Sequence, residues 1–150
     1  MATIRIDRER ENNSFREAWA QSYRSECLKK KVGAVLLDTT TMNIVGRGYG
    51  GAVVPCEKCV RKEYEWQQDG CWSVHSEMRA VFDALETGHK DFSKCVMFTT
   101  HGPCDQCIKL CHLMGIPLMI YDEDYHNDYS KWEGKIKIQK RGELHELDLP

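Results

Sequence analysis

The chain has 150 residues, enough for one ordinary domain, and we expect a single domain over residues 1–150. Hydrophobic residues make up 41% and charged residues 29%, which excludes a disordered tail, a collagen-like fibre and a coiled-coil rod. The formal net charge of -2 argues against a nucleic-acid partner, because most such proteins carry a basic excess. No apolar stretch approaches a membrane span, and residues 1–13 lack the apolar segment of a signal peptide. We therefore expect a cytoplasmic protein with no membrane partner.

The first elements along the chain are predicted to be a helix and a hairpin. Ser14 and Glu17 have the form of a capping box, and apolar residues follow at helical spacing to about Leu28. Residues 32–37 and 44–49 are two apolar runs joined by a polar turn, as in an antiparallel hairpin.

The second half of the chain alternates between helix and strand. Residues 74–87 carry apolar residues at intervals of three and four, which predicts a helix. A strand over 95–100, a helix over 104–114 and a strand over 117–121 form a unit that places its two strands parallel. The alternating residues 135–140 predict an edge strand. The fold class expected is α/β, a three-layer α/β/α domain with a mixed five-stranded sheet.

Eight cysteines in a cytoplasmic chain favour metal coordination over disulfides. Cys104 and Cys107 are three residues apart at the start of a predicted helix, so they can bind one ion, and His75 can supply a third ligand. Three protein ligands leave one position of a tetrahedral zinc open for water, whose pKa the metal lowers to about 7. Glu77 can take that water's proton and pass it on without being a ligand.

Each motif taken singly has a plainer explanation. A Cys-x-x-Cys pair also occurs in structural zinc sites and redox motifs, and a single histidine is most often a core residue. Together, however, His75 and Glu77 upstream and the Pro-Cys-x-x-Cys of residues 103–107 downstream match the general signature of zinc-dependent deaminases.

With these motifs the chain resembles the cytidine and deoxycytidylate deaminase family, and specifically its deoxycytidylate branch. The resemblance covers about residues 14–125 and includes an Arg-Ser-x-Cys segment at 24–27 and a Val-Gly-Ala-Val segment at 32–35. It also includes a Gly-Tyr-x-Gly turn at 48–51 and a Cys-x-x-x-His-x-Glu segment at 71–77.

The resemblance implies a cytidine-deaminase-like fold, a catalytic zinc and hydrolysis of the nucleotide dCMP to dUMP and ammonia, in which hydroxide attacks cytosine C4 and Glu77 moves the protons. It also implies a homo-oligomer, with dCTP and dTTP as candidate effectors. The substrate-binding residues that it implies are Arg24, Ser25, Tyr49, Gly50 and Tyr125. The alternatives are a deaminase of another free or 5-substituted cytosine nucleoside or nucleotide, a polynucleotide deaminase, and a zinc module without catalysis.

Three positions depart from the family pattern: Ser76 replaces Ala, Gly102 replaces Ser or Phe, and Gly50 replaces Asn. In the family that Asn is associated with the sugar of the nucleotide, and the turn around it with effector binding.

A second group of cysteines lies in the long loop before the helix of residues 74–87. Cys56, Cys59 and Cys71 could hold a structural zinc together with one further ligand. The alternative is three loop cysteines without a metal. The candidates for the further ligand are His101, His89 and Cys27.

Basic residues gather where the first predicted helix ends: Arg24, Lys29, Lys30 and Lys31. They are either a solvated helix end, favoured by the helix dipole, or a contact for a substrate phosphate, which a free nucleoside lacks. We expect Arg24 to make that contact.

Overall fold

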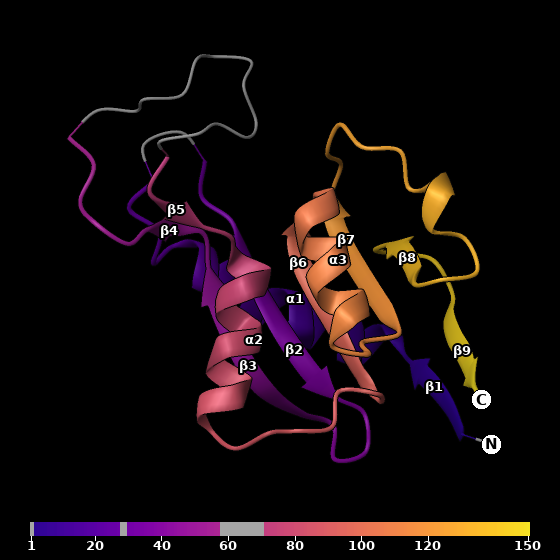
Figure 1. Ribbon diagram of the computed structural model, residues 1–150. Helices are drawn as coiled ribbons and strands as arrows, with labels where there is room; N and C mark the ends of the chain where they lie inside the picture. The colour runs from indigo at the N-terminus through magenta and orange to yellow at the C-terminus, as the bar shows by residue number, and fades with distance from the viewer. Residues whose placement is uncertain (1, 28–29, 58–70) are drawn as a thin grey trace.

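The computed structural model describes residues 2–27, 30–57 and 71–150. Its centre is a five-stranded sheet formed by β2 Gly33–Asp38, β3 Asn43–Tyr49, β6 Cys95–His101, β7 Leu118–Glu123 and β8 Lys137–Lys140 (Figure 1). The strand order across the sheet is β3-β2-β6-β7-β8. β2 runs antiparallel to β3 and β6, whereas β7 is parallel to β6 and β8. The prediction of a mixed five-stranded sheet is therefore confirmed.

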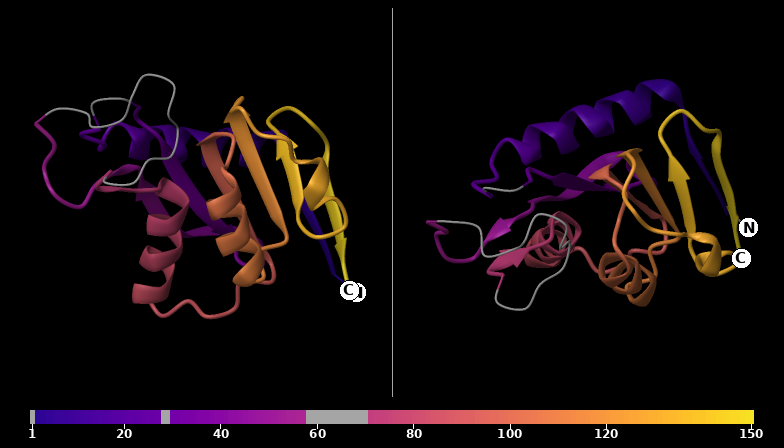
Figure 2. Two further views of the ribbon diagram at one scale, coloured as in Figure 1. Left: turned by 45° about the horizontal axis from the view of Figure 1, so that its top comes forward. Right: turned by 90° about the horizontal axis from the view of Figure 1, so that it is seen from above.

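Helices cover both faces of this sheet, as the three-layer prediction requires (Figure 2). α1 (Arg8–Ser22) lies on one face, and α2 (Ser76–Glu86) and α3 (Asp105–Leu113) lie on the other. Side chains of β2 alternate between the two cores: Val35 and Leu37 pack with residues of α1, whereas Ala34 and Leu36 pack with residues of α2 and α3. The uninterrupted apolar run of β2 is what a strand buried on both faces needs.

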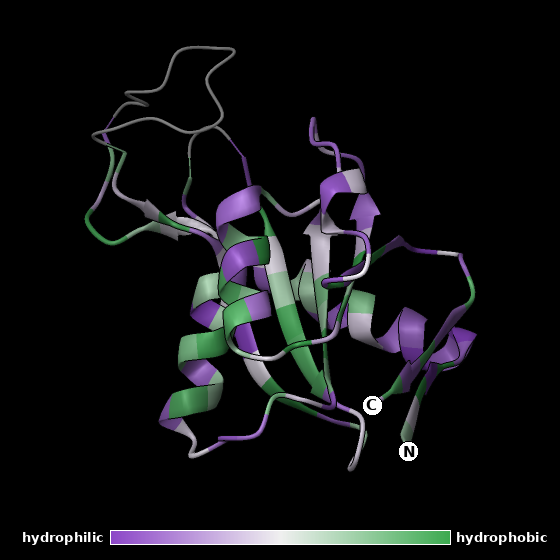
Figure 3. Ribbon diagram, turned by 45° about the vertical axis from the view of Figure 1, so that its right-hand side comes forward, coloured by the Kyte–Doolittle hydropathy of each residue, from purple (hydrophilic) through white to green (hydrophobic). Residues whose placement is uncertain are grey.

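The hydropathy of the residues agrees with this arrangement of a sheet between two helical layers (Figure 3). Apolar residues are concentrated in the central strands, whereas α1 is mostly hydrophilic and buries a narrow stripe that includes Phe15 and Ala18. Among the described residues, no helix has both the length and the apolar character needed to cross a membrane.

The first helix begins earlier than the sequence analysis predicted. α1 starts at Arg8, and the Asp7 carboxylate caps it by accepting a hydrogen bond from Arg10 N at 2.8 Å. Ser14, the expected cap, is buried in the middle of the helix, so that prediction was wrong. The helix also ends at Ser22, several residues before the predicted end. The pattern at Ser14 and Glu17 therefore lies inside the helix, and Asp7 marks its start.

Two strands near the ends of the chain were not predicted. β1 (Ala2–Ile6) pairs antiparallel with β9 (His145–Leu149). Ile4 and Ile6 join the core that contains Phe15. Both strands are short and alternate apolar with charged residues, so neither stands out from a polar loop until its partner is known.

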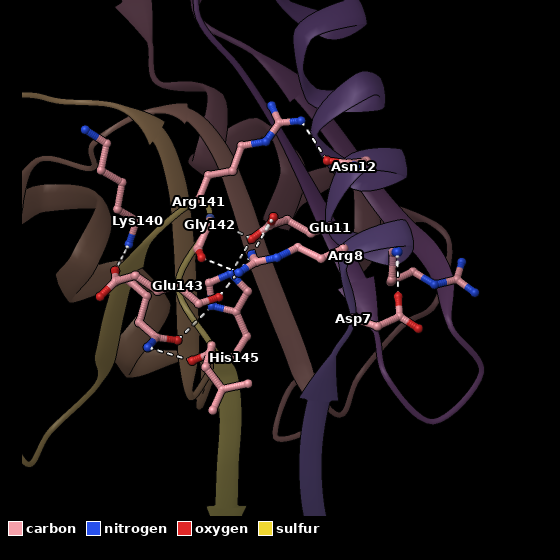
Figure 4. A network of polar contacts seen from close by, with 12 residues as sticks. Asp7, Arg8, Glu11, Asn12, Lys140, Arg141, Gly142, Glu143 and His145 are labelled. Atoms are coloured by element: carbon pink, nitrogen blue, oxygen red, sulfur yellow. Dashed lines mark hydrogen bonds and ion pairs between the residues drawn. The ribbon is translucent and has the colours of Figure 1, made fainter.

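A buried polar network joins α1 to the segment that leads into β9 (Figure 4). Glu11 is 2% exposed and His145 is 1% exposed, and a Glu11 carboxylate oxygen contacts His145 Nε2. Glu11 also accepts hydrogen bonds from Gly142 N and from the Arg8 guanidinium, each at 3.1 Å. Burial alone would raise the pKa of the Glu11 carboxyl, but the hydrogen bonds from Gly142, His145 and Arg8 outweigh it and the pKa lies below its usual value.

Small elements border the carboxyl ends of the central parallel strands. β4 (Gly51–Ala52) pairs antiparallel with β5 (Ser73–Val74), which brings the residues before α2 next to the end of β3. A 3-10 turn, η1 (Ser130–Trp132), follows β7. Ligands of α/β sheets bind at this kind of edge, where helices begin and loops converge.

Candidate active site

The starts of α2 and α3 bring His75, Cys104 and Cys107 together. His75 is the N-cap of α2, Cys104 is the N-cap of α3, and Cys107 lies in the first turn of α3. His75 Nδ1 lies 3.3 Å from Cys107 Sγ and 3.4 Å from Cys104 Sγ. All three ligand atoms lie within 4.8 Å of one another. The structure therefore assembles the three residues that the sequence analysis singled out as metal ligands.

One imidazole nitrogen and two buried thiols form a donor set that suits zinc. Within the described ranges, this is the one group of three or more histidine, cysteine or acidic side chains whose ligand atoms gather in this way. The hydrogen bond with Cys107 lowers the pKa of the Cys104 thiol to about 4, although burial opposes the shift. That contact and burial raise the pKa of the Cys107 thiol. One thiolate is therefore favoured even before a cation binds.

Glu77 lies in the first turn of α2, and its side chain faces the same cavity. It is 6% exposed, and its carboxylate accepts a hydrogen bond from Ser76 Oγ at 2.6 Å. A carboxylate next to the metal ligands, held by a neighbour and open to a cavity, can accept and return protons.

The cavity has a volume of about 390 Å³, a size typical of small-molecule sites. His75, Glu77 and Cys104 form its metal side. The rest of the lining comes from the segment before β2, the residue after β3, the stretch from Cys71 to the start of α2, the stretch from the end of β6 to the start of α3, and the segment after β7: Cys27, Lys30, Val32, Gly50, Cys71, Ser73, Val74, Ser76, Met78, His101, Gly102, Gln106 and Tyr125. Residues from five separated parts of the sequence thus enclose one space.

Of the five substrate-binding residues that the sequence implied, Gly50 and Tyr125 line the cavity. Ser25 is buried behind the lining, where its hydroxyl donates to the Gly50 carbonyl and accepts from Cys27 N at 3.2 Å. Ser25 therefore connects the segment that follows α1 to the turn after β3, and its hydrogen bond holds Gly50 in position.

Arg24 and Tyr49 lie together outside the lining. The Arg24 guanidinium is 4.9 Å from the centre of the Tyr49 ring, and the Arg79 guanidinium is 4.5 Å from it. Arg79 also donates to the Gly51 carbonyl at 3.0 Å, but its buried Nε has no hydrogen-bond partner among the described residues. Lys30, one of the basic residues that the sequence analysis grouped with Arg24, does line the cavity.

The glycines that depart from the family pattern each make room for a neighbour. A Cβ at position 50 would lie 2.3 Å from Val32 Cγ2, so a side chain there would require Val32 to shift. A Cβ at position 102 would lie 2.5 Å from Tyr129 Oη and 3.0 Å from Tyr125 Cβ. The departures therefore reflect close packing around the cavity.

The structure describes only part of the proposed second metal group. Cys27 and Cys71 line the cavity, Cys56 is half-buried, and Cys59 lies outside the described residues. A structural zinc on these cysteines stays a prediction.

The two histidines considered as a further ligand have other partners. His101 Nδ1 lies 2.8 Å from Thr100 Oγ1, and its Nε2 lies 3.2 Å from the Glu123 carboxylate. His89 Nε2 lies 3.4 Å from Cys95 Sγ. Cys27 and His101 both line the cavity together with Cys71, whereas His89 does not.

Sequence reasoning missed one feature of the site, the contact between Asp105 and residues 127–132. An acidic residue in the first turn of a helix is common, because its negative charge interacts favourably with the helix dipole. Nothing in its sequence position indicated partners more than twenty residues away.

The sequence and the fold both have known relatives. Residues 8–123 match the family described as the cytidine and deoxycytidylate deaminase zinc-binding region. A deoxycytidylate deaminase of Mycobacterium phage D29 is 29% identical over 119 residues, which cover 71% of this chain and 89% of the phage protein. The human deoxycytidylate deaminase is 29% identical over 116 residues, which cover 74% of this chain and 63% of the human protein.

The dCMP deaminase of cyanophage S-TIM5, solved in complex with dCMP and dUMP, has a similar fold. Its TM-score is 0.72 at 21% identity, over 90% of this chain and 98% of the phage chain. The predicted cytidine-deaminase-like fold is therefore confirmed. Since the family match spans most of the chain and includes the two motifs that form the metal-binding group, the chain belongs to the cytidine and deoxycytidylate deaminase family.

Proposed function

We propose that this protein hydrolyses dCMP to dUMP and ammonia, with a zinc ion held by His75, Cys104 and Cys107. The observation that carries the proposal is that the ligand atoms of these three residues lie within 4.8 Å of one another, and that His75, Cys104 and Glu77 border one cavity of nucleotide-binding size. Two relatives named deoxycytidylate deaminase, from a phage and from human, support this choice of substrate.

Zinc bound at this site would activate a water molecule and stabilise the negative charge that develops during attack. Glu77 accepts the proton of the attacking water and delivers protons to N3 and to the amine that leaves C4 of cytosine. Burial of Glu77 and the hydrogen bond from Ser76 hold the carboxylate in one place for these transfers.

The phosphate needs a cation, and two residues are placed to supply one. Lys30 lines the cavity, and its Nζ lies 5.9 Å from the centre of the Tyr125 ring, which lines the cavity too. Arg24, the sequence-based candidate, lies outside the cavity lining, beside Tyr49. We assign the direct phosphate contact to Lys30 and a supporting charge to Arg24, with Ser25, Tyr49, Gly50 and Tyr125 shaping the substrate site.

The test is ammonia release from dCMP, deoxycytidine, a 5-substituted dCMP, dCTP and single-stranded DNA, measured side by side. We expect dCMP to have the highest kcat/KM. A higher value for deoxycytidine or for single-stranded DNA would favour one of the alternative deaminases. Glu77→Gln should retain zinc and lose roughly 100-fold or more in kcat, because only proton transfer is removed. If the wild-type protein binds zinc but deaminates none of these compounds, a zinc module without catalysis is the better description.

A homo-oligomer is part of the proposal. Phe82 and Leu85 on α2 and Leu113 on α3 are 51%, 44% and 82% exposed, and these two helices lie side by side on one face. Apolar side chains gathered on neighbouring helices suit a protein partner. Light scattering should give a multiple of the chain mass of 17.4 kDa, and a mass of one chain would contradict the oligomer.

Regulation by dCTP or dTTP is proposed on a separate observation. Arg24 and Arg79 flank Tyr49 in the turn that the family associates with effectors, and a buried nitrogen of Arg79 lacks a partner in the described part of the chain. Two guanidinium groups on one tyrosine ring suit a triphosphate. Dependence of dCMP turnover on added dCTP and dTTP tests this proposal, and rates unchanged by both would contradict it.

We also propose that residues 1–150 form one domain that acts in the cytoplasm. The pairing of β1 with β9 joins the two ends of the chain, and the seven described cysteines are all free thiols.

A further inference from the structure

The segment of residues 125–132, which follows β7, is bound to the turn that carries the metal ligand Cys104. The Asp105 carboxylate accepts hydrogen bonds from Asn127 Nδ2 at 3.1 Å and from Trp132 Nε1 at 3.4 Å, and it forms an ion pair with Lys131. One side chain thus contacts three donors from a segment that lies beyond residues 8–123, the range that matches the family.

The residue on the other side of Cys104 is bound to the same segment. The Pro103 carbonyl accepts hydrogen bonds from Tyr129 Oη at 2.9 Å and from Asn127 Nδ2 at 3.3 Å. Both neighbours of Cys104 are therefore fixed to residues 125–132, which leaves the ligand between two anchored positions.

This segment also supplies a wall of the cavity. Tyr125 lines the cavity, and the ring of Tyr129 packs against that of Tyr121 with 5.6 Å between centres. Gly102 permits the close approach, because a Cβ there would meet both Tyr125 and Tyr129. Movement of the segment would change the position of Tyr125 relative to the metal ligands.

Asp105 is more than a residue that favours the start of a helix. A carboxylate in the first turn of α3 interacts favourably with the helix dipole without any partner from elsewhere. Here its two oxygens also receive an ammonium, an amide and an indole N–H, and charged hydrogen bonds of this kind are about twice as strong as neutral ones. Their shared effect is to hold one segment in one place.

We propose that Asp105 is a positioning residue for the deaminase site: it fastens residues 125–132, and with them the cavity residue Tyr125, to the metal-binding turn. The inference rests on the proposed function, since its kinetic consequence is measured with a cytosine nucleotide. Asp105 itself acts through Tyr125 and touches no reacting atom.

The test compares Asp105→Ala and Asp105→Asn with Asp91→Ala, a control that removes an exposed carboxylate with local hydrogen bonds to Ser93. Asp105→Ala should raise KM for dCMP roughly tenfold, while kcat stays within about twofold and the zinc content is unchanged. Asp105→Asn should give a smaller increase, because an amide oxygen can still accept from Asn127 and Trp132. The control should match the wild-type protein.

Hydrogen exchange supplies a second measurement that needs no substrate. In Asp105→Ala, the amides of residues 125–132 should exchange faster, whereas the amides of β2 and β6 should not change. Adding Trp132→Phe to Asp105→Ala should increase KM little further, because both changes release the same segment.

The outcomes separate this inference from the proposed function. If the wild-type protein deaminates none of the compounds tested but Asp105→Ala loosens residues 125–132, the proposed function fails and the fastening role of Asp105 stands. Unchanged exchange in Asp105→Ala would overturn the fastening role, whatever the kinetics. Faster exchange accompanied by loss of zinc and of kcat at constant KM would assign Asp105 to the stability of the metal turn and overturn its positioning of Tyr125.

Discussion

The Ser76 hydroxyl donates a hydrogen bond to the Glu77 carboxylate at 2.6 Å, and both side chains are buried. Ser76 stands where the family usually has alanine, so this contact is a property of this chain. The hydrogen bond restrains the carboxylate that we assign to proton transfer. Both residues lie in the first turn of α2, directly after His75.

Replacement of Ser76 by alanine should therefore lower kcat without loss of zinc. Removal of one hydrogen bond to a charged group costs about 1.5–3 kcal/mol, and we expect part of this to be expressed as a decrease of roughly 3- to 10-fold in kcat. Steady-state kinetics with dCMP and metal analysis of Ser76→Ala measure the effect. Ser93→Ala, at an exposed position that also bonds a carboxylate, is the matched control. An unchanged kcat would show that burial alone holds Glu77 in place.

The metal-binding cysteines should be distinguishable from the core cysteines. Cys104→Ala should lose both zinc and turnover, because two protein ligands hold zinc weakly. Cys95→Ala should keep zinc, since Cys95 is buried in the core and burial, with smaller effects of nearby acidic groups, raises the pKa of its thiol to about 12. Metal analysis and ammonia release on both variants make the comparison. Retention of zinc in Cys104→Ala would refute the assigned ligand set.

The two basic residues near the cavity should differ in their effects on substrate phosphate. Lys30→Ala should raise KM for dCMP by roughly 10-fold or more, because a charge-assisted contact is lost, and should scarcely change the reaction with deoxycytidine. Arg24→Ala should have a smaller effect in the same direction, since Arg24 lies outside the lining. Lys109→Ala removes an exposed lysine of α3 and serves as the control. A larger effect at Arg24 than at Lys30 would reverse the assignment, and equal losses on both substrates would mean a structural role.

Gly102 and Tyr129 should behave as a coupled pair. In Gly102→Ala the new Cβ would lie 2.5 Å from Tyr129 Oη, so Tyr129 must move and break its hydrogen bond to the Pro103 carbonyl. Overpacking of this kind costs about 1–3 kcal/mol, and we expect a lower Tm together with a higher KM for dCMP. Tyr129→Phe removes the atom that clashes most.

Thermal unfolding of the two single variants and of the double variant tests this coupling. The combined loss of stability should be smaller than the sum of the two single losses. Strictly additive losses would show that Gly102 and Tyr129 act independently.

The buried pair of Glu11 and His145 should make stability depend on pH (Figure 4). The pKa of Glu11 in the folded protein lies below its usual value of 4.5, so the folded state favours the ionised carboxylate. The resulting stabilisation is fully present above the pKa of the unfolded chain, and it is lost as the pH falls through the lower folded pKa.

Glu11→Gln should accordingly lower the free energy of unfolding by roughly 3 kcal/mol at pH 7, and the difference from the wild-type protein should shrink towards pH 3. Urea unfolding at pH 7, 5 and 3 gives the comparison, with Glu9→Gln as a control at an exposed position of the same helix. Comparing variant with wild type at each pH separates this effect from protonation of the metal ligands. A difference that does not vary with pH would contradict the assigned titration.

The sequence by itself determined the chemistry of the site and most of the sheet. The spacing of Cys104 and Cys107 is a local property, because residues three apart on a helix lie on the same side. The apolar run of β2 and the strand-helix-strand pattern of β6, α3 and β7 are also visible in short stretches of sequence. Few sheet topologies are compatible with them, and the parallel pairing of β6 with β7 is the expected one. These features are set by interactions between residues close in the chain.

Only the tertiary structure decided which distant residues meet at the site. It placed Lys30 rather than Arg24 on the cavity wall, joined Asp105 to residues 127–132, and paired β1 with β9. It also moved the start of α1 to Arg8 and left Ser14 buried within the helix. Such contacts depend on how the helices pack on the sheet and on the path that each loop takes over them. Local periodicity carries no information on that, since a single polar residue such as Asp105 is equally compatible with solvent and with a partner more than twenty residues along the chain.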